Sequence, residues 1–245
     1  MLTTTLNKIK EYDPYKIGWD ELISSFPEDQ NYDAQISFKY ILENTGLKYA
    51  LWTLGTLDSE IAVKTSAKLA IEFIAAVPTI IKNVHNGSTF AGVYAEEAFN
   101  EMKAKIFGET KEYERNIDRL IESCIFETTK KVKTAYSELY KHSNDESYYY
   151  IYNLDDARAS ACGAYALLHT SEILENDTSA LDATSLAFDA AVSARAAVAF
   201  SKNMLFDPYI KPSKKTDEAI RDAAIAGAKQ VETERQKEVF IKICG

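Results

Sequence analysis

The sequence predicts an all-α protein, a multi-helix bundle or short helical array within a single domain. Three observations support this fold class. Apolar residues recur at steps of three and four along most of the 245 residues, which is the period of an amphipathic helix. No stretch shows the alternating or β-branched runs, bounded by turns, that indicate strands. All five prolines stand where a helical pattern starts or stops, and a residue without an amide hydrogen is tolerated there.

The domain divides along the sequence into four parts. Residues 1–32 hold one or two short helices around Trp19, and residues 33–108 form a helical core segment. Residues 109–147 form a long helix, and residues 148–245 form a set of alanine-rich helices. A single core in a chain of this length buries about 70–75% of the surface that the unfolded chain exposes. Neither a disulfide nor a structural metal is therefore needed for stability.

The core segment opens with two helices joined at a glycine. Asp33 is expected to cap the first helix, because its carboxylate can accept from the free amides of the first turn. This helix ends at Gly46, since glycine takes the left-handed position at a helix C-terminus without strain. A short helix from Leu47 to Gly55 follows at once. The pair predicts a helix-turn-helix core in which Trp52 is a buried anchor.

Two further helices complete the core segment. The first begins near Asp58 and is stopped by Pro78, so the most apolar stretch, Leu69 to Ile81, is predicted to be a buried helix followed by its stop. That stretch is well short of the roughly 20 apolar residues of a membrane-spanning helix. The second covers Phe90 to Phe107 and is closed by Gly108.

The longest uninterrupted helical pattern runs from Glu109 to His142. Its apolar residues form one stripe along a helix of roughly 50 Å, at 1.5 Å per residue. The stripe consists of Tyr113, Ile117, Leu120, Cys124, Thr128, Val132, Tyr136 and Leu139. Two interpretations stay open, a helix that spans the domain and the seam of a coiled-coil dimer. The steps are not strict heptads, which favours the first.

Alanine dominates the last part of the chain, which is predicted to contain three helices. They cover Leu154 to Glu175, Ser179 to Leu205, and Ser213 to Ile243. Alanine has the best intrinsic helix propensity. Together with Gly163 and Gly227 it removes bulk from the helix surfaces, so we expect these helices to pack closely.

Two of these helices share a short echo. Asp189 to Val192 reads Asp-Ala-Ala-Val, and Asp222 to Ile225 reads Asp-Ala-Ala-Ile. A basic residue follows each within two turns, Arg195 in the first case and Lys229 in the second. The echo predicts a weak helical repeat.

The overall charge disfavours several classes of partner. The chain has 28 Lys plus Arg and 37 Asp plus Glu, which gives a net charge of −9 and argues against binding to nucleic acid.

The N-terminus lacks the apolar core of a signal peptide, so a cytoplasmic protein with no membrane contact is expected. Cys124, Cys162 and Cys244 lie far apart and are expected to be reduced core thiols.

The sequence shows no pattern of catalytic or metal-binding residues. None of His85, His142 and His169 follows a glutamate at the spacing of di-iron helical bundles. A zinc-protease helix, a glycine-rich phosphate loop and a nucleophile elbow are also missing from the sequence. Paired carboxylates such as Asp155 and Asp156 are expected to be solvated. We therefore expect no catalytic residue, no metal and no cofactor.

One local cluster is a candidate binding site. Tyr148, Tyr149, Tyr150 and Tyr152 precede Arg158, and tyrosine combines a flat apolar face with a polar tip, as binding surfaces do. Alternatively, these rings anchor the long helix to the alanine-rich helices. The functional interpretation divides between a protein-contact patch and a pocket for a ring-bearing small molecule, with His169 as a further lining residue.

The segment Ile41 to Leu54 reads Ile-Leu-Glu-Asn-Thr-Gly-Leu-Lys-Tyr-Ala-Leu-Trp-Thr-Leu. It resembles a family of bacterial and phage immunity proteins that carry Ile-Leu-x-x-x-Gly-Leu-x-x-Ala-Leu-Trp-x-Leu, then a helix, then an alanine-rich array. The order is the same here, with Ser59 to Ile61 similar to the helix entry and Leu154 to Ala228 similar to the array. Glu232 to Ile243 is similar to the charged closing helix, whereas Gly55 stands where such sequences commonly carry arginine.

The resemblance covers residues from about 36 to 245 and implies a stoichiometric inhibitor of a toxin or defence protein. An acidic protein suits that role, because many toxins that attack nucleic acids are basic and complementary charge speeds capture. The alternative from the residues is a protein that sequesters a nucleotide-like small molecule in a pocket between helices. Homo-oligomerisation is open in both cases.

Overall fold

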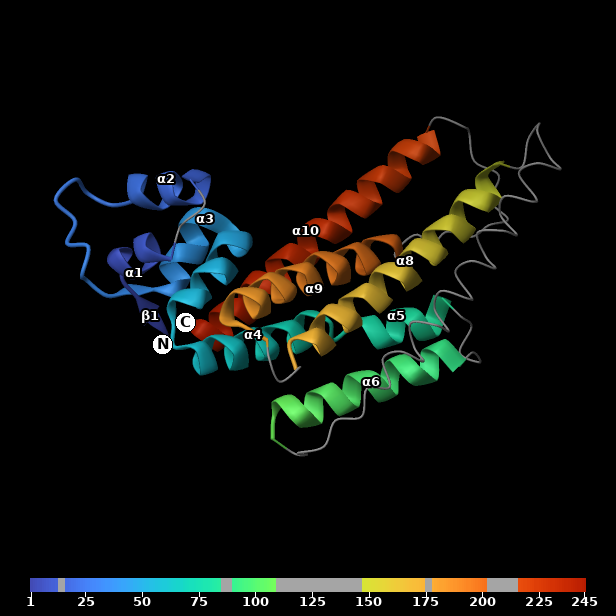
Figure 1. Ribbon diagram of the computed structural model, residues 1–245. Coiled ribbons are helices and arrows are strands. Elements are labelled where there is room, and N and C mark those ends of the chain that lie inside the picture. Colours follow the sequence, from blue (N-terminus) through green and yellow to red (C-terminus); the bar gives the residue numbers. More distant parts are fainter. Residues whose placement is uncertain (13–15, 85–89, 109–146, 175–177, 202–215) are drawn as a thin grey trace.

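The computed structural model describes residues 1–12, 16–84, 90–108, 147–174, 178–201 and 216–245, and they form an all-α protein (Figure 1). The helices are α1 (Leu6–Glu11), α2 (Lys16–Ser24), α3 (Phe38–Thr53), α4 (Ser59–Phe73), α5 (Val77–Val84), α6 (Phe90–Ile106), α8 (Ser147–Glu172), α9 (Ala180–Ser201) and α10 (Thr216–Cys244). A 3-10 turn, η1 (Leu54–Thr56), follows α3. Two short strands, β1 (Thr3–Thr4) and β2 (Ile36–Ser37), complete the described elements.

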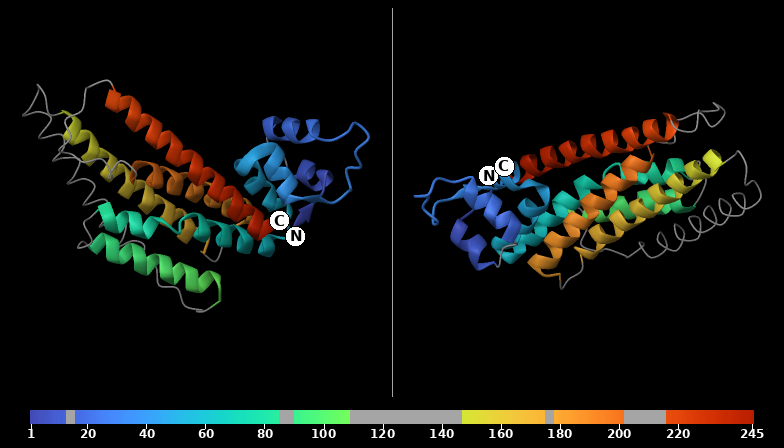
Figure 2. Two further views of the ribbon diagram at one scale, coloured as in Figure 1. Left: turned by 180° about the vertical axis from the view of Figure 1, so that it is seen from behind. Right: turned by 90° about the horizontal axis from the view of Figure 1, so that it is seen from above.

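Helix α9 is the centre of the molecule. It packs against α8, α4, α10 and α3, and α8 lies beside it along most of its length (Figures 1 and 2). The short helices α1 and α2 gather with α3 at one end of the elongated bundle, whereas α5 and α6 lie along α8. The two chain ends meet, because the amide of Leu2 donates to the carbonyl of Cys244 at 2.9 Å.

The start of α3 differs from the sequence-based prediction. Ser37, and not Asp33, is the N-cap, and its hydroxyl accepts from the amide of Tyr40 at 3.2 Å. The reason is a pairing that is distant in sequence, since Ile36 and Ser37 form an antiparallel ladder with β1 and the helix cannot begin before they end. Asp33 instead accepts from the side-chain amide of Asn7 at 2.7 Å. The expectation that the chain has no strands is therefore wrong for Thr3–Thr4 and Ile36–Ser37, although the protein is all-α.

The glycine joint inside α3 is confirmed. Gly46 has φ 78° and ψ 175°, a conformation that is essentially restricted to glycine, and the helix resumes directly after it. The second half of α3 ends at Thr53, slightly before the predicted Gly55, and η1 continues it. Trp52 is buried, with 8% of its surface exposed, as the sequence predicts.

The apolar stretch after Asp58 is divided into two helices, and the predicted role of Pro78 is wrong. Asp58 caps α4 as expected, its carboxylate accepting from the amide of Glu60 at 3.0 Å. The break falls at Ile74 to Ala76, and Pro78 lies in the first turn of α5. A proline is tolerated there because the amides of a first turn have no partner within the helix. Gly108, with φ 76°, follows α6 as predicted.

The alanine-rich helices are present with shifted ends. Helix α8 begins at Ser147, seven residues before the predicted start, so the tyrosine cluster lies inside its first turns. Helix α9 is lined by alanines on its buried sides, and α10 is the long closing helix. Cys244 is buried and Cys162 is partly buried, and both are free thiols.

Several predictions fall outside the described residues. They are the long helix from Glu109 to His142 with Cys124, and the choice between a domain-spanning helix and a coiled-coil seam. These stay predictions.

Helix α9 is long and apolar enough to cross a membrane by length and composition, a criterion that a central core helix also meets.

Candidate functional site

A cleft with a volume of about 250 Å³ opens between α3 and α9. Helix α3 supplies Lys48 and Trp52, which follow one another by one turn and so share a face. The residues of α9 that line the cleft are Thr184, Ser185, Phe188 and Asp189. Aromatic rings therefore meet hydroxyl and charged groups in one cleft.

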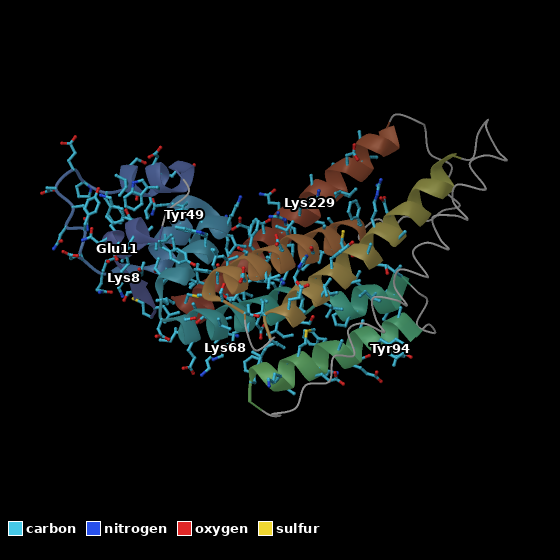
Figure 3. All side chains as sticks on the ribbon, viewed as in Figure 1. Lys8, Glu11, Tyr49, Lys68, Tyr94 and Lys229 are labelled. Atoms are coloured by element: carbon cyan, nitrogen blue, oxygen red, sulfur yellow. The ribbon has the colours of Figure 1, made fainter. Side chains whose placement is uncertain are left out.

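Behind the cleft, Trp52 is held between two tyrosines. Its ring centroid lies 5.0 Å from that of Tyr12 and 5.4 Å from that of Tyr49, and the Tyr49 ring is stacked at an interplanar angle of 25°. Figure 3 labels Tyr49 on α3. Such ring pairs stabilise by about 0.5–1.5 kcal/mol beyond the area that they bury. These two neighbouring rings thus hold the indole in place.

The tyrosine hydroxyls of this cluster are unusual. Neither Tyr12 Oη nor Tyr49 Oη has a hydrogen-bond partner among the described residues, although both atoms are buried. Burial raises the pKa of Tyr49 and of Tyr12, and the carboxylate of Asp182 raises the pKa of Tyr12 further. A β-carbon at Gly55 would stand 2.1 Å from Tyr12 Oη. This contact explains why a side chain as large as arginine has no room at that position.

The rim of the cleft carries both signs of charge. The ammonium of Lys48 lies 5.7 Å from the centroid of the Phe188 ring, within the range of a cation–π contact. Asp189 and Ser185 are exposed, whereas the hydroxyl of buried Thr184 donates to the carbonyl of Leu181 at 2.8 Å. The lining contains no histidine or cysteine that could act as base or nucleophile. Lys48 and Asp189 can pair with charged groups, and the rings of Trp52 and Phe188 can pack on a flat one.

The residues that the sequence singles out lie elsewhere, along α8. The backbone of Tyr148, Tyr149, Tyr150 and Tyr152 is helical, and their side chains are outside the described part of the structure. Asp155 is buried, so the expectation that it is solvated is wrong, and Arg158 pairs with it at 3.2 Å. Arg158 also lies over the ring of Phe200, 5.6 Å from the centroid.

His169 is one helix turn from two side chains of α8. Its ring stacks on that of Tyr165 with centroids 6.2 Å apart, and its Nδ1 lies 3.5 Å from a carboxylate oxygen of Glu172. Eleven residues separate it from Arg158, which is about 16 Å along a helix. The structure therefore does not bring His169 and Arg158 together, and neither residue lines the cleft.

The sequence patterns do not predict the cleft. They predict correctly that Trp52 is buried and that Asp189 lies on a helix, but they do not predict that both residues line one cleft. The missing information is that α3, which ends at Thr53, and α9, which begins at Ala180, lie side by side. Within the described residues, no group of three His, Cys, Asp or Glu side chains is placed to hold a metal ion.

Comparison of the chain with known protein families, with curated proteins and with solved structures gave no match.

Proposed function

We propose that the chain is a non-enzymatic binding protein of bacterial or phage conflict, which inhibits a toxin or defence protein in the cytoplasm by stoichiometric binding. The observation that carries the proposal is the cleft between α3 and α9. The segment that resembles immunity proteins contributes Lys48 and Trp52 to it. The family-like residues thus form part of a surface as well as part of the core.

The chemistry of the cleft supports recognition of a protein side chain. Protein interfaces depend on a few anchors that insert into well-packed pockets, surrounded by polar groups at the rim. Trp52 and Phe188 supply the apolar part of such a pocket, and Lys48 and Asp189 supply its charged rim. The net charge of −9 favours a basic partner, since complementary charge raises the association rate.

Co-expression with toxins and defence proteins from the same genomic neighbourhood tests the proposal. The wild-type protein is expected to form a complex with one of them and to protect the cell. Ser185→Trp fills the cleft from its exposed side and is expected to abolish both effects, whereas Ser24→Trp, on the exposed end of α2, leaves them unchanged. If no candidate forms a complex with the protein and none is neutralised by it, the proposal is contradicted.

A second candidate function is the sequestration of a nucleotide-like small molecule. The same cleft favours it, because aromatic rings stack on a base and the ammonium of Lys48 can pair with a phosphate. A panel of nucleotides and cyclic nucleotides is then expected to raise the melting temperature of the wild type and not that of Ser185→Trp. No rise with any of them would exclude this candidate.

Native mass spectrometry of protein purified gently from its host separates the two candidates. Extra mass of several kilodaltons beyond whole copies of the 27.5 kDa chain supports a protein partner. Extra mass of a few hundred daltons per chain supports a trapped ligand.

The predicted contact patch at Tyr149 and Tyr150 is tested by replacing both with alanine. The double variant is expected to lose partner binding and to keep the free energy of unfolding of the wild type.

A further inference from the structure

The cleft between α3 and α9 already contains a cation on an aromatic ring. The ammonium of Lys48 lies 5.7 Å from the centroid of the Phe188 ring, and both residues line the cleft. The face of an aromatic ring attracts a cation because the ring quadrupole is negative there. Lys48 is exposed, and its flexible four-carbon side chain can turn towards solvent. The ring of Phe188 can therefore exchange this cation for one that a partner supplies.

The polar groups that α9 contributes to the cleft are hydrogen-bond acceptors. Asp189 provides an exposed carboxylate, which accepts and does not donate when it is ionised. The buried hydroxyl of Thr184 donates its proton to the carbonyl of Leu181 at 2.8 Å, so only its lone pairs are left for a ligand. The exposed hydroxyl of Ser185 can accept as well. A group that fits this side of the cleft must carry several donors.

A second carboxylate adds negative potential along the same side of α9. Asp182 precedes Ser185 by three residues and Asp189 by seven, so the three residues share one face of the helix. Burial and the charge of Asp182 both raise the pKa of Tyr12, which lies behind the cleft. The chain as a whole carries a net charge of −9. This potential favours a positively charged ligand.

The volume of the cleft suits a single side chain. At about 250 Å³ it is smaller than the roughly 300–1,000 Å³ of pockets that enclose whole small molecules. The guanidinium of arginine is planar, so it can stack on a ring, and it has five N–H donors in a fork that matches a carboxylate. The ammonium of lysine has neither the plane nor the fork. Arginine is therefore the side chain that satisfies the ring and the acceptors together.

We propose that the cleft binds an arginine side chain of a basic protein partner, with the guanidinium stacked on Phe188 in the place of the Lys48 ammonium and paired with the carboxylate of Asp189. This inference rests on the proposed function, because it assigns the side chain that the protein partner inserts. Lys48 is then a competitor within the chain, which the arginine of the partner displaces. Removal of this charged residue from the cleft should accordingly strengthen binding.

The fluorescence of Trp52 measures the binding of short blocked peptides to the full chain. In a Trp19→Phe background Trp52 is the remaining tryptophan, and it lines the cleft. At constant ionic strength, acetyl-Gly-Arg-Gly-amide is expected to change its emission with a Kd of about 1 mM, as a single anchoring side chain allows. The lysine peptide should bind at least about threefold more weakly. The citrulline peptide keeps the shape of arginine without its charge and should not bind.

Two pairs of variants in the same background test the contacts. Asp189→Asn should weaken binding of the arginine peptide about tenfold, since a charge-assisted pair is lost. Glu97→Gln removes the same charge from the exposed surface of α6, outside the cleft, and should leave binding unchanged. Lys48→Met should strengthen binding about threefold, because methionine has no competing ammonium. Lys68→Met is its control, since Lys68 is an exposed cation of α4 outside the cleft (Figure 3).

The direction of the Lys48→Met effect is the decisive result. Weaker binding of the arginine peptide in that variant would overturn the inference, as would equal binding of the arginine and citrulline peptides. A protein partner captured on co-expression, whose binding neither Asp189→Asn nor Lys48→Met changes, would overturn the inference and leave the proposed function standing. Arginine-specific binding without any protein partner would contradict the proposed function, whereas the assignment of the cleft to arginine would hold.

Discussion

The same four-residue pattern has opposite environments in two helices. In α9, Ala190 and Ala191 of the Asp-Ala-Ala-Val segment are buried between neighbouring helices. In α10, Ala223 of the Asp-Ala-Ala-Ile segment is exposed and Ala224 is half-buried. Alanine therefore specifies a helix in both places without specifying burial. The two helices differ in how many other helices pack around them. Helix α9 is surrounded, whereas the first half of α10 packs on one side only.

The two glycines of the alanine-rich part show the same contrast. A β-carbon on Gly163 of α8 would lie 3.1 Å from side-chain atoms of Val77 and Ile81, so close packing against α5 is confirmed there. Gly227 of α10 meets nothing among the described atoms, and the expectation of close packing is wrong for it within the chain.

The largest expected effect lies on the packed side of the comparison. Trp52→Ala should lower the free energy of unfolding by about 3–5 kcal/mol, because it removes a buried ring that stacks on Tyr12 and Tyr49. Ile220→Ala on the exposed face should change it by less than about 0.5 kcal/mol in dilute protein. Denaturant titration measures both, and a loss below 1 kcal/mol for Trp52→Ala would contradict the packed environment of that ring.

Enlarging the equivalent alanines compares the two helices directly. Ala190→Leu should destabilise by about 1–3 kcal/mol, since α9 has no room for three more carbon atoms. Ala223→Leu, at the matching position of α10, should change the free energy of unfolding by less than about 0.5 kcal/mol. Equal losses in the two variants, measured by denaturant titration, would remove the distinction between the helices.

The anchored end of α10 should make stability depend on alkaline pH. Burial raises the pKa of the Cys244 thiol to about 12, whereas an unfolded chain loses that proton near pH 8.5. Between these values only the unfolded state is deprotonated, so stability falls as pH rises, by up to about 1.4 kcal/mol per pH unit. Unfolding of the wild type and of Cys244→Ala at pH 8 to 11 measures the slope, and parallel slopes would show that the thiol is not protected.

The smallest effect concerns the two glycines. Gly227→Ala should stabilise dilute protein by about 0.5–1 kcal/mol, because alanine is the better helix former and the site is open. Gly163→Ala should gain less, since its new methyl group presses on Val77 and Ile81. Thermal unfolding at low protein concentration compares them, and an equal gain in both would contradict the close packing at Gly163.

Periodicity and caps in the sequence predict the fold class and many helix ends correctly. Asp58, Gly46 and Gly108 act locally, and the structure confirms each of them. Asp33 was a wrong cap because the pairing of Ile36 with Thr4 outweighs a good local signal. Pro78 was a wrong stop because the same residue also suits a first turn.

The candidate site was harder to predict for a related physical reason. Composition identified the tyrosines of α8, which are adjacent in the sequence, but a cleft depends on which helices become neighbours. Lys48 and Phe188 come within cation–π range only after α3 packs on α9. The sequence does not contain that adjacency in any local pattern.

Hydrogen exchange of α9 and of the first half of α10 tests most directly the claim that one alanine-rich helix is surrounded by neighbours and the other is packed on one side only. The account predicts slow exchange in residues 180–201 at every concentration. In residues 216–230 it predicts faster exchange. Equal protection of both segments would contradict it.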